Sequence, residues 1–446
     1  MRVYLETLGC RLNFSEMETL ARRLIAAGHV VVPSAAMAEV CVLNTCAVTH
    51  RAASDSRQAV RALAKENPIA RLAVAGCYAE LEPATVAALP QVRWVVGNRD
   101  KDRLLDLLEE EAGRCSDEAS EVAVVSASSL SPDATPFPLS RTRSFVKVQD
   151  GCNNRCTFCI VSVVRGRERS RPLETVVREV ANLAAAGVQE VVLTGVHLGG
   201  YGRDLGTNLR ALVAALLERT PIRRLRLSSL EPFDLDVDFF DLWADSRLCP
   251  HLHLPLQSGC DATLRRMARR GSTAQFARLA EAARARIPDL TLTTDVIVGF
   301  PGETEEEFAQ SLAFVAAMEF AHVHVFPYSL RVGTAAARLP DQVPPEAKRE
   351  RSAAMREVDR RSGRTVRRRF LGQTRPVLWE SQGQKVVGEK GRIWSGLTDN
   401  YLRVLTLAPE NLNLHNVITP ARLTRLEGDA LWAEVAEADV AHEAAA

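Results

Sequence analysis

Val146-Lys-Val-Gln-Asp-Gly-Cys152-Asn-Asn-Arg-Cys156-Thr-Phe-Cys159 joins a short apolar strand pattern to three cysteines with the spacing C-x3-C-x2-C. Three thiolates so close together, with no fourth cysteine or histidine beside them, suit a 4Fe-4S cluster whose fourth iron stays open to a ligand. Zinc is the competing metal, but a closed structural zinc site needs four nitrogen or sulfur ligands, usually in two pairs. Three buried free cysteines at this spacing are the remaining alternative, and they would be a coincidence.

The chain around and after this motif alternates strand-like and helical patterns. Helical sequence includes Leu173–Ala186, with Gly187 as its C-cap, and Thr304–Met318, which begins with a Thr-x-x-Glu capping box. Six parallel βα units predict a partial barrel over residues 141–370, with the cysteine loop after its first strand and its functional groups at the carboxyl ends of the strands. The expected strands are Phe145–Gln149, Glu190–Thr194, Leu225–Ser229, His251–Leu254, Thr291–Gly299 and His322–Pro327.

Residues 1–111 show the same alternation and predict a separate α/β domain with a parallel sheet. Val3–Leu8, Val40–Asn44 and Leu72–Ala75 are strand-like, and helical sequence separates them. Ser15 begins a Ser-x-x-Glu capping box, which predicts a helix from Ser15 to about Ala27.

The remaining segments differ in composition from both α/β regions. Residues 112–140 are rich in Ser, Ala, Asp and Pro, which is typical of a linker. Residues 371–437 predict a small antiparallel β-barrel of short strands, and residues 438–446 predict a flexible tail. The strands expected in the small barrel are Val377–Glu380, Lys385–Gly388, Arg392–Trp394, Leu402–Leu407, Val417–Leu426 and Ala430–Val435.

A second set of cysteines lies in the first domain, and each follows an expected strand. They are Cys10, Cys46 and Cys77. If the strands are parallel neighbours, the three thiols can converge at one sheet edge and form another cluster site with an open iron. The alternative is that they are small core residues at strand ends. The other cysteines, Cys41, Cys115, Cys249 and Cys260, are expected to be structural.

Composition indicates a globular protein of two or three domains without a membrane span or signal peptide, and hence a cytoplasmic location. Ten cysteines then favour metal binding over disulfides. The net charge of +1 conceals clusters of arginine, each of which is either a solvated helix face or a nucleic-acid contact. The clusters are Arg165, Arg167, Arg169 and Arg171; Arg265, Arg266, Arg269 and Arg270; and Arg360, Arg361, Arg364, Arg367, Arg368 and Arg369.

Together these motifs resemble the methylthiotransferases, radical S-adenosylmethionine (SAM) enzymes, across nearly the whole chain. The resemblance rests on Gly9-Cys10-x-x-Asn13, Asn44-Thr-Cys46, Gly76-Cys77 and the Cys152 loop, followed by a small barrel. It implies an N-terminal domain with an auxiliary 4Fe-4S cluster, a radical-SAM partial (β/α)6 barrel with a second 4Fe-4S cluster, and a TRAM domain of OB-like build.

The residues of these motifs are most similar to those of the branch that acts on N6-threonylcarbamoyladenosine in tRNA. Thr7-Leu-Gly-Cys-Arg-Leu-Asn13 with Glu16, and Asn44-Thr-Cys-Ala-Val-Thr49 followed by Ser54-Asp-Ser-Arg-Gln58, carry this similarity. The alternatives are the branches that act on isopentenyladenosine in tRNA or on a ribosomal protein. A non-catalytic iron–sulfur carrier or sensor would need neither a SAM turn nor an RNA-binding barrel.

The resemblance also implies where SAM binds. The turn at Thr194-Gly195 would receive the SAM amino group, and segments after the fourth and fifth strands would line the site, although a strand–turn–helix junction or a helix cap would also place such residues there. No catalytic side chain is expected beyond the cluster ligands. The expected SAM contacts are Phe158, Thr194, Gly195, Glu231, Gln257, Asp295 and Phe326.

The implied reaction replaces the C2 hydrogen of the modified adenosine at position 37 of tRNA with a methylthio group. No acid–base pair removes such a hydrogen at neutral pH, so a carbon radical is the plausible agent, and two SAM molecules are expected to be used, one for methyl transfer and one for the radical. The expected partners are a tRNA anticodon stem-loop and an electron donor such as flavodoxin or ferredoxin. The RNA contacts are expected at Arg360, Arg364, Arg367, Arg368, Arg369 and Arg403, with Trp394 and Tyr401 available for stacking.

Overall fold

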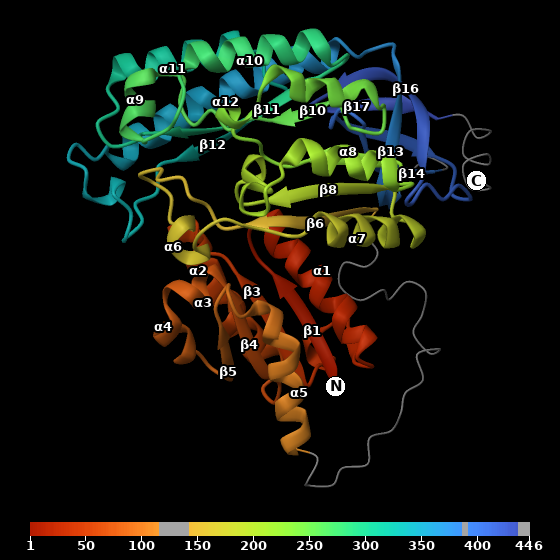
Figure 1. The fold of residues 1–446 in the computed structure, drawn as a ribbon. Helices are drawn as coiled ribbons and strands as arrows, with labels where there is room; N and C mark the ends of the chain where they lie inside the picture. Colours follow the sequence, from red (N-terminus) through yellow and green to blue (C-terminus); the bar gives the residue numbers. More distant parts are fainter. Residues whose placement is uncertain (116–141, 386–390, 436–446) are drawn as a thin grey trace.

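The computed structural model describes residues 1–115, 142–385 and 391–435, and it places an α/β domain below a larger barrel that carries a small β-barrel at its side (Figure 1). The expected linker 112–140 and tail 438–446 therefore lie mostly outside the described residues. No helix among the described residues is long and apolar enough to cross a membrane.

The first domain contains a five-stranded sheet, and all its strands are parallel, as predicted. The strand order is β2-β1-β3-β4-β5. Every residue of β3 is buried because helices cover both faces of the sheet. The strands are β1 (Arg2–Thr7), β2 (Val30–Val32), β3 (Val40–Thr45), β4 (Arg71–Gly76) and β5 (Val92–Val96).

The first helix begins four residues earlier than predicted. Helix α1 spans Arg11–Ala26 and has Cys10, not Ser15, at its N-cap. The Ser15 hydroxyl instead accepts a hydrogen bond from the backbone N–H of Lys147 in the barrel, at 2.9 Å. The capping-box prediction was wrong because this hydroxyl serves a contact between domains. The other helices of the domain are α2 (His50–Glu66), α3 (Cys77–Leu81), α4 (Pro83–Ala87) and α5 (Leu104–Cys115).

The central part contains the six predicted parallel strands in two sheets. One sheet has the order β7-β6-β8-β9 and the other β10-β11-β12, and isolated parallel bridges such as Ser229 to His253 join them into a partial barrel. Strands β6 and β12 are the two ends of this series, so the barrel has an open side between them. The strands are β6 (Arg143–Asp150), β7 (Arg169–Ser170), β8 (Glu190–Gly195), β9 (Arg224–Leu227), β10 (His251–His253), β11 (Thr291–Val298) and β12 (His322–Pro327).

Helices cover the outside of the partial barrel. The Thr304 hydroxyl caps α11 by accepting from the Glu307 N–H at 3.2 Å, and Gly187 adopts a φ of 85° after α7, so both predicted helix ends are confirmed. The helices are α6 (Val161–Arg165), α7 (Leu173–Ala185), α8 (Leu209–Arg219), α9 (Asp261–Arg266), α10 (Thr273–Arg286), α11 (Glu305–Ala317) and α12 (Pro345–Arg368).

The C-terminal part is a closed barrel with the order β13-β14-β15-β17-β16. Its core includes Trp379 and Trp394, so the prediction that Trp394 offers a face for stacking RNA bases was wrong. The expected strand Val377–Glu380 lies within β13, and Lys385–Gly388 falls mostly outside the described residues. The strands are β13 (Thr374–Lys385), β14 (Arg392–Thr398), β15 (Arg403–Ala408), β16 (Ile418–Glu427) and β17 (Ala430–Glu434).

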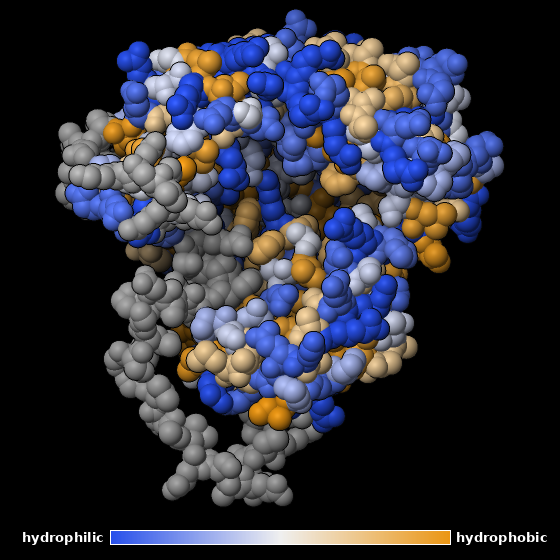
Figure 2. All heavy atoms as spheres, turned by 180° about the vertical axis from the view of Figure 1, so that it is seen from behind, coloured by the Kyte–Doolittle hydropathy of each residue, from blue (hydrophilic) through white to orange (hydrophobic). Residues whose placement is uncertain are grey.

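The first domain packs against the open side of the partial barrel. Helix α1 lies beside β6, and α6 lies above α3 (Figure 1). From behind, a hollow separates the first domain from the barrel above it, and hydrophilic side chains stand around that hollow (Figure 2). The carboxyl ends of the strands of both parts therefore lie near one interface.

Candidate active site

The first set of cysteines lies at the carboxyl ends of β1, β3 and β4. Gly9 has a φ of 99°, and a Cβ on it would lie 2.6 Å from Cys46 Cβ and 2.8 Å from its Sγ, so only glycine lets Cys10 approach Cys46 here. The pKa of the Cys46 thiol is raised to about 11, chiefly by burial and in smaller part by the nearby thiols of Cys10 and Cys77. The fold thus brings the three thiols together.

Two asparagine side chains support these thiols. Cys10 Sγ donates to Asn13 Oδ1 at 3.8 Å, and Asn13 in turn donates to the backbone oxygens of Leu8 and Thr45 at 2.7 and 3.1 Å. Asn98 Nδ2 lies 3.6 Å from Cys77 Sγ. These amides hold the loops that carry the cysteines.

A buried cluster of charges separates the first cysteine set from the second. The Glu16 carboxylate contacts Lys101, Lys147 and Arg165, and Arg165 also bonds Asp150 at 3.0 Å. Although burial opposes it, these cations hold the pKa of Glu16 well below its usual range. Three cations face two carboxylates, so the cluster is net positive and favours anionic thiolates beside it.

The second set of cysteines lies in the loop that follows β6. The Cys159 backbone N–H donates to the Cys156 oxygen at 3.1 Å, and the pKa of Cys159 is raised to about 12, chiefly by burial and in smaller part by the nearby Cys156 and Cys152 thiols. Arg269 lies with Nη1 3.8 Å from Cys156 Sγ and 3.0 Å from Glu231 Oε1. The predicted SAM contact Glu231 is therefore paired with an arginine beside the cysteine loop, and its side chain caps no helix.

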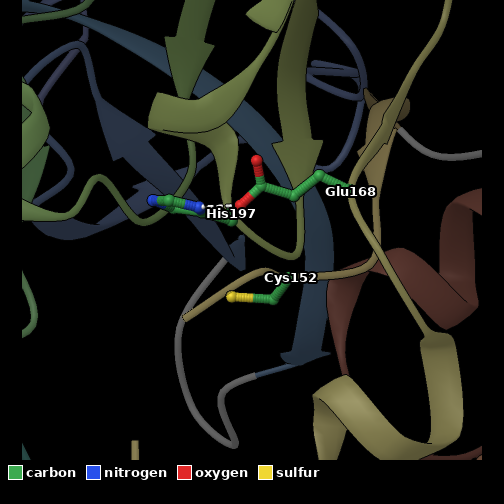
Figure 3. Close-up of side chains that lie close together, drawn as sticks. All are labelled: Cys152, Glu168 and His197. Carbon is green, nitrogen blue, oxygen red and sulfur yellow. Dashed lines mark hydrogen bonds and ion pairs between the residues drawn. The ribbon is translucent and has the colours of Figure 1, made fainter. Parts of the chain in front are cut away.

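His197 lies beside Cys152 and Glu168, in the turn after β8 (Figure 3). Its Nδ1 is 2.6 Å from Glu168 Oε1, and its Nε2 contacts Asp234. Burial opposes its protonation, but hydrogen bonds to Asp234, Cys152 and Glu168 raise the pKa of His197 to about 10. These contacts hold the ring beside Cys152 at the start of the cysteine loop.

The other predicted SAM contacts lie around the carboxyl ends of the barrel strands. Thr194 and Gly195 end β8, and Gly195 lies against Gln149, whose amide donates to the Gly151 oxygen at 2.8 Å. Gln257 adopts a φ of 70°, a strained conformation for a residue other than glycine. Phe158 meets the Phe300 ring edge-on at 6.4 Å.

Asp295 and Phe326 lie on neighbouring strands and differ in their surroundings. Asp295 Oδ2 is 3.3 Å from His253 Nε2, whereas the Phe326 side chain is 45% exposed. The Asp295 carboxylate thus belongs to a polar group inside the barrel, and Phe326 offers an apolar face at its rim.

A cavity of about 590 Å³ lies between the partial barrel, α1 and the C-terminal barrel. Arg360, Arg367 and Arg403 line it, while Arg364 and Arg368 are exposed on α12 and Arg369 pairs with Glu319. The six arginines predicted to contact RNA therefore do not form one face. Tyr401, expected to stack on RNA bases, instead stacks on His251 with ring centroids 4.5 Å apart.

Two family models match the two parts of the chain that carry the cysteine sets. A model of the radical SAM superfamily matches residues 146–315, and one described as uncharacterized protein family UPF0004 matches residues 2–97. The threonylcarbamoyladenosine tRNA methylthiotransferase MtaB of Bacillus subtilis is 35% identical over 92% of this chain and 91% of that protein. Its namesake in Thermotoga maritima is 37% identical over 85% of this chain and 86% of that protein. The chain belongs to the radical-SAM tRNA methylthiotransferases.

Other relatives are named for a different substrate. A tRNA-2-methylthio-N(6)-dimethylallyladenosine synthase of Acidothermus cellulolyticus is 39% identical over 78% of this chain and 71% of that protein. Among solved structures, the radical SAM methyltransferase TsrM from Kitasatospora setae has a TM-score of 0.55 at 14% identity and covers 73% of this chain and 72% of that chain. That likeness supports the fold alone.

The residues of this methylthiotransferase fit the cofactors of the family, two 4Fe-4S clusters and SAM. The nine described cysteines are all free thiols, and six of them form the two converging sets. The remaining three are buried: Cys41 packs in an apolar cluster, Cys249 lies near Arg226 and Glu190, and Cys260 Sγ donates to Gln310 Oε1 at 3.4 Å. Cys115 ends α5, and its side chain lies outside the described part of the chain.

Several polar residues of this methylthiotransferase site were not recognised in the sequence. Lys101 and Lys147 reach Glu16 from other elements, and His197 lies within the turn already assigned to SAM. A lysine inside an apolar strand pattern was the available signal for Lys147. Nothing in the local sequence marks Lys101, because its partner is 85 residues away.

Proposed function

We propose that this protein converts N6-threonylcarbamoyladenosine at position 37 of tRNA to its 2-methylthio derivative. The observation that supports this most is the link between the two cysteine sets. Arg165 follows the second set by six residues and donates to Asn13 Oδ1 at 2.8 Å, and that oxygen also accepts from Cys10 of the first set. Two cofactor sites joined in this way suit a reaction that needs both sulfur insertion and a radical.

In this proposal Cys10, Cys46 and Cys77 hold the auxiliary cluster, and Cys152, Cys156 and Cys159 hold the radical-SAM cluster. When bound, the two clusters and SAM supply the sulfur chemistry, the methyl group and a carbon radical. The protein binds and orients these groups. Phe158, Thr194, Gly195, Gln257 and Phe326 surround SAM, and the buried charges at the domain interface exclude water from the space between the two sites.

The rest of the proposal concerns the domains, the recognition of tRNA and the supply of an electron. Residues 1–111, 141–370 and 371–437 form the auxiliary-cluster, radical-SAM and TRAM domains, and 112–140 links the first two. The TRAM domain and α12 contact the anticodon stem-loop through arginine. A low-potential flavodoxin or ferredoxin supplies the electron, and the work takes place in the cytoplasm, where tRNA is modified.

Reconstituted protein tests this proposal directly. Protein loaded anaerobically with iron and sulfide is incubated with SAM, a reductant and tRNA that carries threonylcarbamoyladenosine, and the nucleosides are analysed by mass spectrometry. We expect 2-methylthio product together with 5′-deoxyadenosine, and neither from the Cys152→Ala variant. Product from isopentenyladenosine tRNA alone would refute the substrate assignment.

A further inference from the structure

The cavity between the domains opens at the side of the partial barrel where β6 and β12 do not pair with each other. Arg143 of β6 and His324 of β12 lie on its two sides, Arg11 of α1 projects into it, and Thr291 and Thr293 form its inner wall. The same face of β11 continues to Asp295 and Ile297, and Ile297 packs against the same apolar cluster as Phe158, near the SAM end. The cavity therefore leads from the side of the barrel toward the cofactor sites.

Arg11 brings an uncompensated positive charge into this cavity. It follows Cys10 directly, and its Nη2 donates to the Tyr401 hydroxyl at 2.9 Å. Its guanidinium also lies 5.7 Å from the Tyr401 ring centroid and 6.0 Å from that of Phe145. Among the residues that the structure describes, Arg11 forms no ion pair. Its guanidinium can therefore bind an anion such as a carboxylate through two hydrogen bonds.

Beside Arg11 lies a polar layer of the barrel, which consists of the side chains of His253, Asp295 and His324. His253 Nδ1 is hydrogen-bonded to Thr293 Oγ1 at 2.9 Å, and its Nε2 lies 3.3 Å from Asp295 Oδ2. The ring centroids of His253 and His324 are 5.6 Å apart. His253, Asp295 and His324 could together hold a cation. Burial above all, with His322, His253 and Arg11, lowers the pKa of His324 to about 4 although Asp295 opposes this, so its imidazole is neutral.

We propose that Arg11, with His253 and His324, binds the carboxylate and hydroxyl of the threonylcarbamoyl group and so selects the substrate nucleoside. This inference rests on the proposed function and adds the residues that determine its specificity. The ring atoms C2 and C6 of adenine both flank N1, and N6 is attached to C6, so a base with C2 at the cofactors keeps its N6 substituent on the same edge. The residue beside Cys10 is therefore well placed to contact that substituent.

The same groups disfavour an isopentenyl substituent. This substituent has no polar atoms, so it would cover the guanidinium and imidazoles without replacing the hydrogen bonds that they make to water. Sites built to hydrogen-bond a substrate reject analogues that lack the polar group. Discrimination between the two tRNA substrates follows from the charge of Arg11 and the hydrogen-bonding groups of the two imidazoles.

Binding measurements on the full reconstituted chain test the inference. The probes are three anticodon stem-loops that differ only at position 37, with threonylcarbamoyladenosine, isopentenyladenosine or adenosine. For Arg11→Met we expect about 10- to 100-fold weaker binding of the first stem-loop and little change for the adenosine stem-loop. Arg11→Lys keeps the charge and should recover part of the affinity, and Arg356→Met on α12 is the matched control.

The two possible sources of the anion give different results. If Arg11 binds a backbone phosphate, Arg11→Met weakens all three stem-loops equally, and the inference is overturned. Unchanged binding of the threonylcarbamoyl stem-loop overturns it as well. Iron content is measured in parallel and should be about eight atoms per chain in Arg11→Met, which shows that both cluster sites are still loaded.

Failure of this inference differs from failure of the proposed function. If wild-type protein methylthiolates the threonylcarbamoyl tRNA and Arg11→Met binds it equally well, only the assignment of Arg11 fails. If wild-type protein modifies only isopentenyl tRNA, the proposed function fails with it. A KM that rises in Arg11→Met while kcat changes little supports a role in binding.

Discussion

Gly9 is the residue on which the geometry of the first cysteine set depends most. Its φ of 99° and its contact with Cys46 leave no space for a Cβ. We expect Gly9→Ala to lose the auxiliary cluster but keep the second one, so that iron content falls from about eight to about four atoms per chain. Release of 5′-deoxyadenosine should persist while methylthiolation stops.

Gly28→Ala is the matched control for Gly9→Ala. Gly28 also has a positive φ, of 82°, but nothing lies within 4 Å of its added Cβ. Both variants therefore carry the same type of backbone strain, and only Gly9→Ala disturbs a cysteine. An equal loss of iron in the two variants would show that strain, not contact with Cys46, is responsible.

Glu190 and Arg226 form a fully buried ion pair between β8 and β9, with Arg226 Nε 2.7 Å from Glu190 Oε1. Removal of one partner from such a pair costs about 3–5 kcal/mol, so we expect Glu190→Gln to lower the melting temperature markedly. Glu174→Gln, which breaks the exposed pair with Arg219, should leave it unchanged. Calorimetry distinguishes the two variants.

The same pair predicts a pH dependence of unfolding. Burial opposes the charge of Glu190, but Arg226 prevails and lowers the pKa of Glu190 to about 2. Because the folded pKa lies below the unfolded one, the stabilisation is complete above about pH 4.5 and is lost as the pH falls toward 2. Wild-type melting temperature should fall through this range by more than that of Glu190→Gln.

At the level of elements, α6 and α1 are joined by Arg165, which reaches Glu16 at 2.9 Å and Asn13 at 2.8 Å. We expect Arg165→Met to destabilise the chain by about 3–5 kcal/mol because it leaves buried carboxylates with fewer partners. Methylthiolation should fall more than release of 5′-deoxyadenosine, since the first cysteine set loses its support. Denaturant unfolding and both product assays measure these effects.

Arg22→Met is the control for this contact between domains. Arg22 of α1 bonds Glu179 of α7 at 2.8 Å, but both side chains retain contact with solvent. Its loss should cost less than about 1 kcal/mol. If both variants behave alike, the interface is held by packing and not by the buried charge cluster.

The start of α1 shows why elements were only partly predictable. Periodicity correctly predicted the six parallel barrel strands, three of the five strands of the first domain and the helices that follow Pro172 and Thr304, because burial on the two faces of a strand or along one side of a helix repeats locally. Ser15 was assigned as a cap because it precedes Glu18 by three residues, yet its hydroxyl accepts from Lys147, 132 residues away. Likewise, the positions of the six cysteines were visible in the motifs, whereas Lys101 joined the site through a contact that no local pattern encodes.

On the scale of the whole molecule, α12 is the element that connects the partial barrel to the C-terminal barrel, and it presents arginines to two environments. Arg364 and Arg368 are exposed, whereas Arg367 lines the cavity and pairs with Asp429 at 3.9 Å. Burial lowers the pKa of Arg367, although Asp429 and Asp359 oppose this. The outer pair is therefore better suited to the phosphates of the stem, and Arg367 to a group at the cavity mouth.

We expect Arg364→Glu with Arg368→Glu to weaken binding of any tRNA, whatever its nucleoside at position 37, because phosphate contacts carry no sequence information. The slope of log affinity against log salt concentration should fall by about one for each phosphate that the variant no longer neutralises. Arg61→Glu on α2 changes charge on the surface of the other domain and is the control. If the double variant keeps both affinity and slope, α12 does not contact the stem, and recognition of tRNA must be assigned to the cavity and the C-terminal barrel.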